Sequence, residues 1–406
     1  MATIAENIQT LRSIKSGIKQ AITDKGGSVG NDFKTYAQAI TNLPSGGGGG
    51  TEIEDALVTR TLSEYSNDRV SVVGSYAFYT YSTLTSVNLP NCTSVNEYGF
   101  AKCRSLTSIN LPNCSYIGYS TFNYCNSLTS VNLPNCISVN SCAFSDCIKL
   151  TNVNLPLCIS VGDSTFYDCQ SLISVNLPLC TSIGGSIFAF CFKLSNINIP
   201  LLSLVKGSTF YKCSALSSIS LPNCTIVGGG AFEHCEALQF ISLPNCSIIH
   251  NYAFYYCSAL QSIDLPLCTS LNYNEFASCK SLTTVNLPNC SYIGTGVFAY
   301  CDTLPSIELP NCSNIDGYGA FSNCSSISII RIPVCSSIGY YAFADCINLK
   351  ELYLNSITSV TTIQSNTFSN SPNLTSVYVP TSLVDAFKTA QYWSSMSTKI
   401  VAYTGA

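Results

Sequence analysis

The chain has 406 residues, of which 46% are hydrophobic and only 10% are charged, and its formal net charge is -4. This composition is enough for a large buried core, and it excludes a basic nucleic-acid-binding surface and a charged disordered tail. No apolar run reaches the roughly 18 residues that a membrane span needs, so we expect neither nucleic acid nor membrane as a partner.

Residues 1–45 are predicted to form a helical head. Over residues 2–25, apolar side chains recur at spacings of three and four, which indicates an amphipathic helix; they are Ile4, Ile8, Leu11, Ile14, Ile18 and Ile22. A second short helix is expected at Asp32–Leu43, before the flexible glycine linker at residues 46–50. A unit of this size buries too little surface by itself, so its apolar face needs a partner.

The sequence leaves two alternatives for what the head packs against. It could dock on the rest of the chain as a cap, or it could self-associate as a short coiled coil or attach to a larger assembly. The glycine linker favours the second alternative, because a cap has to be held close. We therefore predict oligomerisation through the six apolar residues, with a trimer favoured, and attachment of the head to other proteins.

After a lead-in at residues 51–69, a unit of 22 residues is repeated about 14 times between residues 70 and 380. The unit from Ser105 to Asn126 reads SLTSINLPNCSYIGYSTFNYCN. One phenylalanine marks each unit: Phe78, Phe100, Phe122, Phe144, Phe166, Phe188, Phe210, Phe232, Phe254, Phe276, Phe298, Phe321, Phe343 and Phe368. Self-similarity at this period is the signature of a solenoid.

Each unit is predicted to form a short strand, a turn and a segment that packs inward. Alternation at the end of Leu106–Leu111 places Ile109 on a buried face, which is typical of a half-buried strand. Pro112 ends the strand, and the spacing of Phe122 and Cys125 suits a short helical or 3₁₀ turn. One unit cannot bury its own apolar face, so the units should stack with parallel strands about 4.8 Å apart.

The 24 cysteines follow the same period. Twelve follow the phenylalanines by three residues, eleven follow the strand prolines by two, and Cys142 is left over. A metal site needs clustered ligands such as C-x-x-C, which are missing. A disulfide framework is possible in a secreted protein, although stacked cysteines would have parallel Cβ vectors. A column of buried, reduced thiols is favoured, because Leu202 replaces cysteine in one unit.

The outward column of the strands is a first candidate binding surface. Its first half is a uniform row of asparagines, as expected for a solvated sheet face. Its second half varies and ends in Glu308, Arg331, Tyr353 and Tyr378. Variation in an otherwise copied column is typical of a recognition surface.

A second candidate is a ridge of aromatic residues one or two positions after the core phenylalanines, including Tyr255, Tyr256 and Tyr300. Tyrosine rings suit both sugar faces and protein partners. The alternative is that these rings pack on neighbouring turns as a stacked seam.

Catalysis finds little support in the sequence. His234 and His250 occupy different columns, no column repeats a carboxylate, and no G-x-S-x-G, phosphate-loop or H-E-x-x-H motif is present. We predict no enzymatic activity, no cofactor and no metal.

The C-terminal residues 381–406 are predicted to close the solenoid. A helix is expected to run to about Trp393, started by a capping box of Ser382 and Asp385, and Ile400–Tyr403 should add an edge strand. Terminal repeats of solenoids need such covers.

The repeat L-x-x-[VI]-x-L-P…[VI]-G-x-x-[AT]-F-x-x-C resembles the BspA-type leucine-rich repeat, for example in Leu128–Pro134 with Val139–Cys147. The resemblance implies an α/β repeat solenoid with short parallel strands, added to the helical head. Similar proteins mostly serve surface adhesion or recognition in gut and oral bacteria, parasitic protists and their phages.

The head, with MATIAENIQTLRSIKSGIKQAI, DFKTYAQAITNLP and a glycine run, resembles the leader of tail and virion-associated proteins of gut phages and prophages. Together the resemblances imply a virion protein of tail-fibre or decoration type. Its rod would bind a glycan or protein of the host surface, and its head would bind other virion proteins. The alternatives are a bacterial cell-surface adhesin and a structural spacer without ligand. We expect no secretion signal or surface anchor, which favours the virion.

Overall fold

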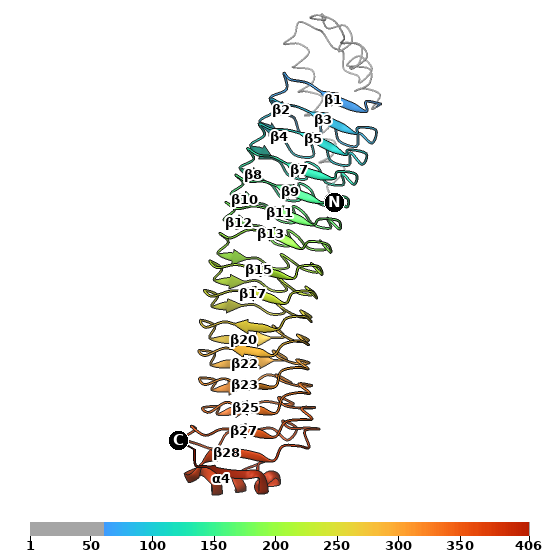
Figure 1. Cartoon of the computed structure of the whole chain (residues 1–406). Helices are drawn as coiled ribbons and strands as arrows, with labels where there is room; N and C mark the ends of the chain where they lie inside the picture. Colours follow the sequence, from blue (N-terminus) through green and yellow to red (C-terminus); the bar gives the residue numbers. More distant parts are fainter. Residues whose placement is uncertain (1–60, 406) are drawn as a thin grey trace, which may run out of the picture.

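The structure is a computed structural model that describes residues 61–405. The predicted head, with its six apolar residues, the glycine linker and the first part of the lead-in lie outside the described residues. The described chain is a rod of about 15 stacked turns with a period of about 22 residues (Figure 1). The solenoid with short parallel strands is therefore confirmed.

Two strands alternate in nearly every turn. The first set has three residues in most turns and comprises β1 (Glu64–Ser66), β3 (Ser86–Asn88), β5 (Ser108–Asn110), β7 (Ser130–Asn132), β9 (Asn152–Asn154), β11 (Ser174–Asn176), β13 (Asn196–Asn198), β15 (Ser218–Ser220), β17 (Phe240–Ser242), β19 (Ser262–Asp264), β21 (Thr284–Asn286), β23 (Ser306–Glu308), β25 (Ile329–Arg331), β27 (Glu351–Tyr353) and β28 (Ser376–Pro380). The second, shorter set comprises β2 (Val72–Val73), β4 (Ser94–Val95), β6 (Tyr116–Ile117), β8 (Ser138–Val139), β10 (Ser160–Val161), β12 (Ser182–Ile183), β14 (Leu204–Val205), β16 (Ile226–Val227), β18 (Ile248–Ile249), β20 (Ser270–Tyr273), β22 (Tyr292–Thr295), β24 (Asn314–Ile315) and β26 (Ser337–Ile338).

Equivalent residues of neighbouring turns pair in parallel register. Across β1, β3 and β5, for example, the partners are Tyr65, Val87 and Ile109. Equivalent residues of successive turns, 22 apart in most of the chain, therefore lie in columns along the rod. The partners of β1 also show that the solenoid begins earlier than predicted, within the segment assigned to the lead-in.

The segment around each phenylalanine forms the third side of a turn. It is a series of hydrogen-bonded turns and not a helix. In one turn, the backbone N–H groups of Ser120, Phe122 and Tyr124 donate to carbonyls of the next turn at 2.7–3.0 Å. Ser120 and Tyr124 have φ values of 49° and 59°, in the left-handed region. The chain therefore bends sharply on both sides of the phenylalanine.

The core is a continuous stack of the repeated phenylalanine rings. Neighbouring rings lie 4.9–5.7 Å apart between centroids and within 21° of parallel. Each turn thus packs against the turns before and after it, as solenoids require.

The cysteines are free thiols, and all except Cys142 are buried. Those of the first column donate from Sγ to the carbonyl of the phenylalanine one turn earlier, as Cys103 does to Phe78 at 3.0 Å. Those of the second column donate to the carbonyl two residues ahead, as Cys92 does to Ser94 at 3.2 Å. Burial raises the pKa of Cys103 to about 12. The arrangement is that of the reduced column, with the thiol of each column position donating to a backbone carbonyl.

The C-terminal segment differs from its prediction. It comprises η1 (Thr381–Leu383), α4 (Val384–Thr389), η2 (Ser394–Lys399) and β29 (Ile400–Tyr403), which pairs with β28. Neither η1 nor α4 has a side-chain cap hydrogen bond, so the capping box of Ser382 and Asp385 is wrong. The helix also ends at Thr389, because Ala390 is extended.

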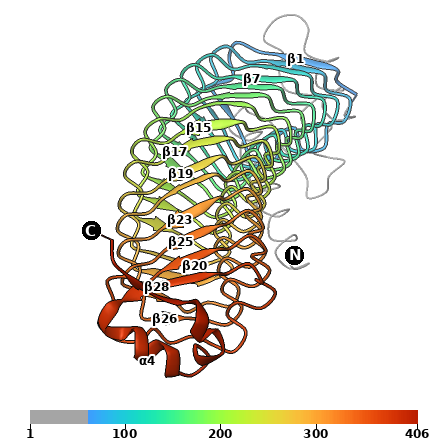
Figure 2. The same cartoon turned by 60° about the horizontal axis from the view of Figure 1, so that its bottom comes forward.

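This segment nevertheless covers the end of the core, and Figure 2 shows α4 lying across the last turns. Trp393 is buried, lies 6.0 Å from the last ring of the stack, Phe368, and contacts Phe387 edge-on at 5.1 Å. Its Nε1–H donates to the Thr361 carbonyl at 2.7 Å.

Candidate functional site

The four predicted residues of the outward strand column lie side by side. Glu308, Arg331, Tyr353 and Tyr378 are register partners on β23, β25, β27 and β28. The parallel register follows from the unit length, so the sequence spacing was enough to place them on one face.

Three of them form a continuous surface that we name the platform: Arg331, Tyr353 and Tyr378. The Arg331 guanidinium lies 4.6 Å above the Tyr353 ring, and the Tyr353 and Tyr378 rings stack at 4.5 Å. Tyr403 of β29 adds an edge contact to Tyr353 at 6.2 Å. Sequence reasoning missed Tyr403, because the register of the last strand was unknown.

The platform carries one charged group, the Arg331 guanidinium, beside tyrosine hydroxyls. The Tyr353 hydroxyl donates to Glu351 Oε2 at 2.9 Å. Partial burial and this carboxylate raise the pKa of Tyr353, so its hydroxyl keeps its proton at neutral pH. Flat rings beside a guanidinium and the exposed Glu308 can stack on a sugar ring or an aromatic side chain and hydrogen-bond to its polar groups.

The first half of the same column is chemically different. Its six asparagines form an amide ladder: Asn88, Asn110, Asn132, Asn154, Asn176 and Asn198. Four of them donate from the amide nitrogen to the amide oxygen of the asparagine one turn earlier, at 2.7–2.9 Å. The donors are Asn110, Asn154, Asn176 and Asn198. Four of the five neighbouring pairs of amides are therefore hydrogen-bonded to each other, Asn110 and Asn132 being the exception.

The predicted tyrosine residues also meet. Tyr255, Tyr256 and Tyr300 line one cavity of about 500 Å³, together with Lys280 and Asn274, and we name it the tyrosine pocket. Tyr256 and Tyr300 have φ values of 59° and 60°, at the left-handed position that follows each core phenylalanine. The pocket belongs to the phenylalanine side of the turns and the platform to the strand side, so the structure does not combine them.

Both interpretations of the aromatic ridge have support in the contacts. His234 stacks on Tyr256 at 4.9 Å, and Tyr255 meets Tyr256 edge-on at 4.7 Å, which is the expected seam. Tyr300, in contrast, is 50% exposed at the rim of the pocket. A ring that is free on one face can still receive a ligand.

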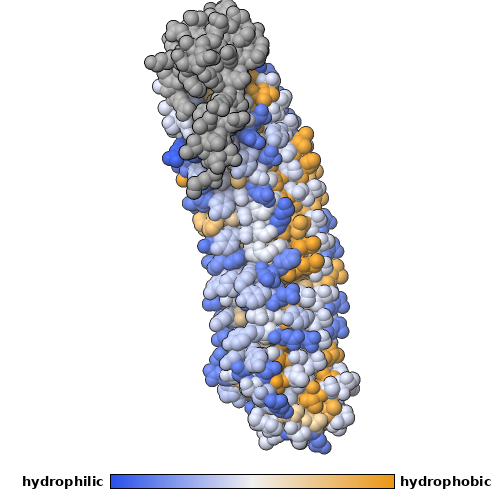
Figure 3. All heavy atoms as spheres, turned by 180° about the vertical axis from the view of Figure 1, so that it is seen from behind, coloured by the Kyte–Doolittle hydropathy of each residue, from blue (hydrophilic) through white to orange (hydrophobic). Residues whose placement is uncertain are grey.

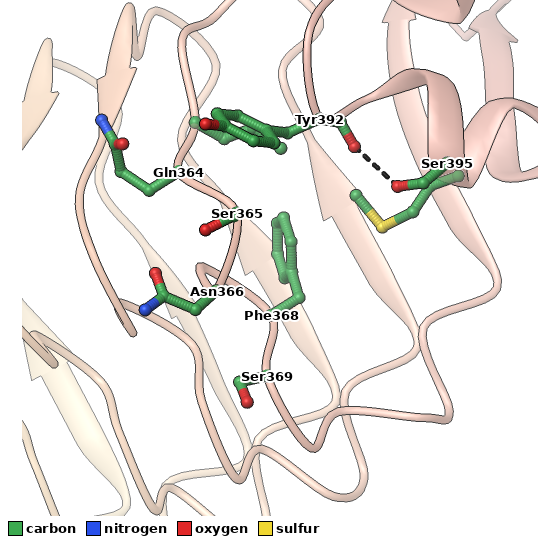
Figure 4. Close-up of a pocket in the computed structure, with 9 residues that line it drawn as sticks. Gln364, Ser365, Asn366, Phe368, Ser369, Tyr392 and Ser395 are labelled. Carbon is green, nitrogen blue, oxygen red and sulfur yellow. Dashed lines mark hydrogen bonds between the residues drawn. The ribbon is translucent and has the colours of Figure 1, made fainter.

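A third pocket, of about 250 Å³, lies at the C-terminal end of the rod (Figure 4). It is formed between Gln364, Asn366 and Phe368 of the last turn and Tyr392 of the C-terminal segment. Asn366 Oδ1 is buried without a hydrogen-bond partner. Sequence reasoning missed this pocket because the insertion before Phe368 and the C-terminal segment lie outside the repeat.

Residues that could support catalysis do not converge in the described part. Within residues 61–405, no group of three or more histidine, cysteine, aspartate or glutamate side chains is placed to hold a metal ion. His234 packs in the aromatic ridge and lies 3.7 Å from Glu236, whereas His250 is exposed in another column. Over the same residues, no helix has the length and apolarity to cross a membrane.

Comparison with known proteins agrees with this architecture. The sequence profile described as BspA type Leucine rich repeat region (6 copies) matches residues 63–173, 138–261, 181–290 and 269–398. No relative is found among curated proteins.

Solved structures of bacterial repeat proteins are similar. A leucine-rich repeat protein from Bacteroides ovatus is 26% identical, with a TM-score of 0.59, over 82% of this chain and 88% of that one. A leucine rich cell surface protein from Faecalibacterium prausnitzii is 23% identical, with a TM-score of 0.42, over 67% and 84%. A leucine-rich repeat protein from Eubacterium ventriosum is 18% identical, with a TM-score of 0.45, over 76% of this chain and 88% of that one.

Proposed function

Since the chain belongs to the BspA-type leucine-rich repeat family, we propose that it is a recognition protein that binds a host-surface glycan or protein through the platform. A leucine-rich repeat solenoid is typically non-catalytic, which agrees with a binding role. The observation that carries the proposal is the change along one column, from the self-satisfied amide ladder to stacked tyrosines beside Arg331. The tyrosine pocket is a second binding surface in this proposal.

The favoured setting is a phage or prophage virion, with the protein as a tail fibre or decoration. The support is the resemblance of the head to virion-associated leaders, and the head would oligomerise the rod and bind virion proteins. A bacterial cell-surface adhesin is equally compatible with the family and with the similar protein of Bacteroides ovatus. Adjacent structural virion genes would favour the first setting, and surface-assembly genes the second.

The test of binding compares two triple variants in one column. Arg331, Tyr353 and Tyr378 are replaced by alanine in the first, and Asn88, Asn110 and Asn132 in the control. Binding of the full chain is measured on a glycan array and on whole gut bacteria, with thermal melting to verify the fold. We expect the platform variant to lose binding and the control to keep it.

The opposite pattern would overturn the platform as the binding surface. If the platform variant binds like the parent and a triple alanine variant of the tyrosine pocket does not, recognition belongs to that pocket. If the parent chain binds neither the array nor any cell, the structural spacer becomes the better description.

A further inference from the structure

An exposed apolar stripe runs along one edge of the rod in the half nearer its N-terminal end. Figure 3 shows hydrophobic residues gathered in a band on this edge. We define the apolar stripe as Ile137, Leu157, Ile159, Leu179 and Leu201, which come from four consecutive turns and are 39–49% exposed. None of them belongs to the platform or to the tyrosine pocket.

The stripe interrupts two polar columns that are otherwise hydrogen-bonded. The position after each strand proline is usually asparagine, whose amide donates to the proline carbonyl one turn earlier, as Asn113 does to Pro90 at 2.8 Å. Leu157, Leu179 and Leu201 replace it in three successive turns. These turns lose that hydrogen bond and expose a large apolar side chain instead.

The neighbouring column changes in the same part of the rod. Its usual serine or threonine donates to a carbonyl one turn earlier, as Thr93 does to Ser71 and Thr225 to Ser203 at 3.0–3.1 Å. Ile137 and Ile159 replace these hydroxyls. The two polar columns therefore become apolar in overlapping parts of the rod, and both do so in the turn of Leu157 and Ile159.

The chain segments that carry the stripe contain no charged residue. The segments from the longer strand to the shorter strand are Ser130–Val139, Asn152–Val161, Ser174–Ile183 and Asn196–Val205, and none contains a charged residue. Beside the stripe lies the amide ladder. Burial of this surface would leave no charge unpaired, and depletion of charge is typical of the centre of a protein interface.

We propose that the apolar stripe packs against the same stripe of a parallel copy of this chain. Because all stripe residues repeat along the rod at about 4.8 Å, two parallel copies match turn for turn. The stripe spans only about 15 Å along the rod. A surface of this length buries less than the roughly 800 Å² per partner that is usual for a stable interface. A tether at the N-terminal end of the described chain would supply the missing affinity by raising the local concentration.

The proposal therefore rests on the oligomerisation proposed for the head. The other occupant within the chain is the head itself. If helical as predicted, the apolar residues from Ile4 to Ile22 would extend over about 27 Å, nearly twice the length of the stripe. A second copy matches the stripe in length, chemistry and period, and the head does not match it in length.

Disulfide trapping tests the contact in the full chain. Leu179→Cys is introduced in a Cys142→Ser background, which removes the partly exposed native thiol. Leu267→Cys is the matched control, because Leu267 occupies the same column, is 48% exposed and has asparagine neighbours in that column. After mild oxidation, we expect a covalent dimer for position 179 and none for position 267.

Light scattering on the same samples separates the possible failures. An oligomer without a dimer at position 179 overturns the stripe contact and leaves the oligomerisation of the head intact. A monomer overturns both. If the chain is monomeric and the thiol at position 179 becomes more reactive when residues 1–50 are removed, the head is the occupant of the stripe.

Discussion

At the residue scale, the two cysteine columns supply hydrogen-bond donors where a larger group would not fit. The last turn supports this view, because Ser371 takes the place of cysteine there and its hydroxyl donates to the Phe343 carbonyl at 2.7 Å. A small side chain with one donor is therefore what the site requires, and the thiol meets that need with little desolvation.

Burial of the thiols makes the fold sensitive to alkaline pH. The folded pKa of Cys103 is about 12 and its ordinary value is 9.0, so between these values the thiol ionises only when the chain unfolds. The contribution of each such thiol to the free energy of unfolding is fully present below pH 9. Above pH 9 it falls by about 1.4 kcal/mol per pH unit. Urea unfolding at pH 7.5, 9 and 10.5 should show this loss. Above pH 9, Cys103→Ser should make the fall of the unfolding free energy with pH less steep by the contribution of one thiol. A slope that is unchanged in Cys103→Ser would contradict the account.

The donor role can be tested separately from size. Cys346 donates to the Phe321 carbonyl at 3.2 Å. Cys346→Ser keeps the donor, as Ser371 does one turn later. Cys346→Ala removes one of the two hydrogen bonds that the Phe321 carbonyl accepts, the other coming from the Cys324 N–H at 3.3 Å, at a cost of about 0.5–1.5 kcal/mol. We expect the alanine variant to be the less stable of the two in urea unfolding. Equal stability would show that the thiols only fill space.

At the element scale, the sequence period predicted the core better than the surface. The burial of Leu106, Ile117 and Phe122 follows from the alternation of apolar residues in the unit. The left-handed residues could not be predicted, because most of them are not glycine, and many different residue types occupy these positions. The early first strand was missed because Asn67 and Asp68 follow it where the unit has leucine and proline.

The same contrast holds for the candidate site. The platform was predictable because its residues are 22–25 positions apart in one column, and the parallel register places such residues side by side. The C-terminal pocket was not, since Asn366 and Tyr392 are brought together by segments that have no period. Nothing in the repeat specifies how the insertion and the last helix pack.

The C-terminal segment should stabilise the last turns mainly through Trp393. Trp393→Ala removes a buried ring from the end of the phenylalanine stack and leaves the Thr361 carbonyl without its donor, at a cost of about 3–5 kcal/mol. Hydrogen exchange should increase in the turns around Phe343 and Phe368 and remain low near Phe166. Tyr392→Ala, at an exposed neighbour, is the control and should change little. Uniform loss of protection along the rod would show instead that the chain unfolds as one unit.

At the scale of the whole molecule, each turn contacts only its neighbours, so the number of turns can change without altering the ends. Deletion of residues 209–252, two periods of 22, joins Ser208 to Ala253 in the same register. We expect this variant to fold, to keep the platform and the stripe, and to be about 10 Å shorter in small-angle scattering. Deletion of residues 209–219 shifts the register by half a unit and should prevent folding. A folded half-unit variant would contradict the column architecture.

The direction of the hydrogen bonds between turns has a mechanical consequence. These bonds run along the rod, so the turn-to-turn contacts are arranged in series between its two ends. Tension between the ends acts on every contact, and the weakest contact breaks first. Both strand sets are interrupted between the turns of β17 and β19, where β18 and β20 also belong to different sheets. A rod anchored at one end and bound to a surface at the other should therefore open near Ser242 and Asp264, while the turns on either side stay folded.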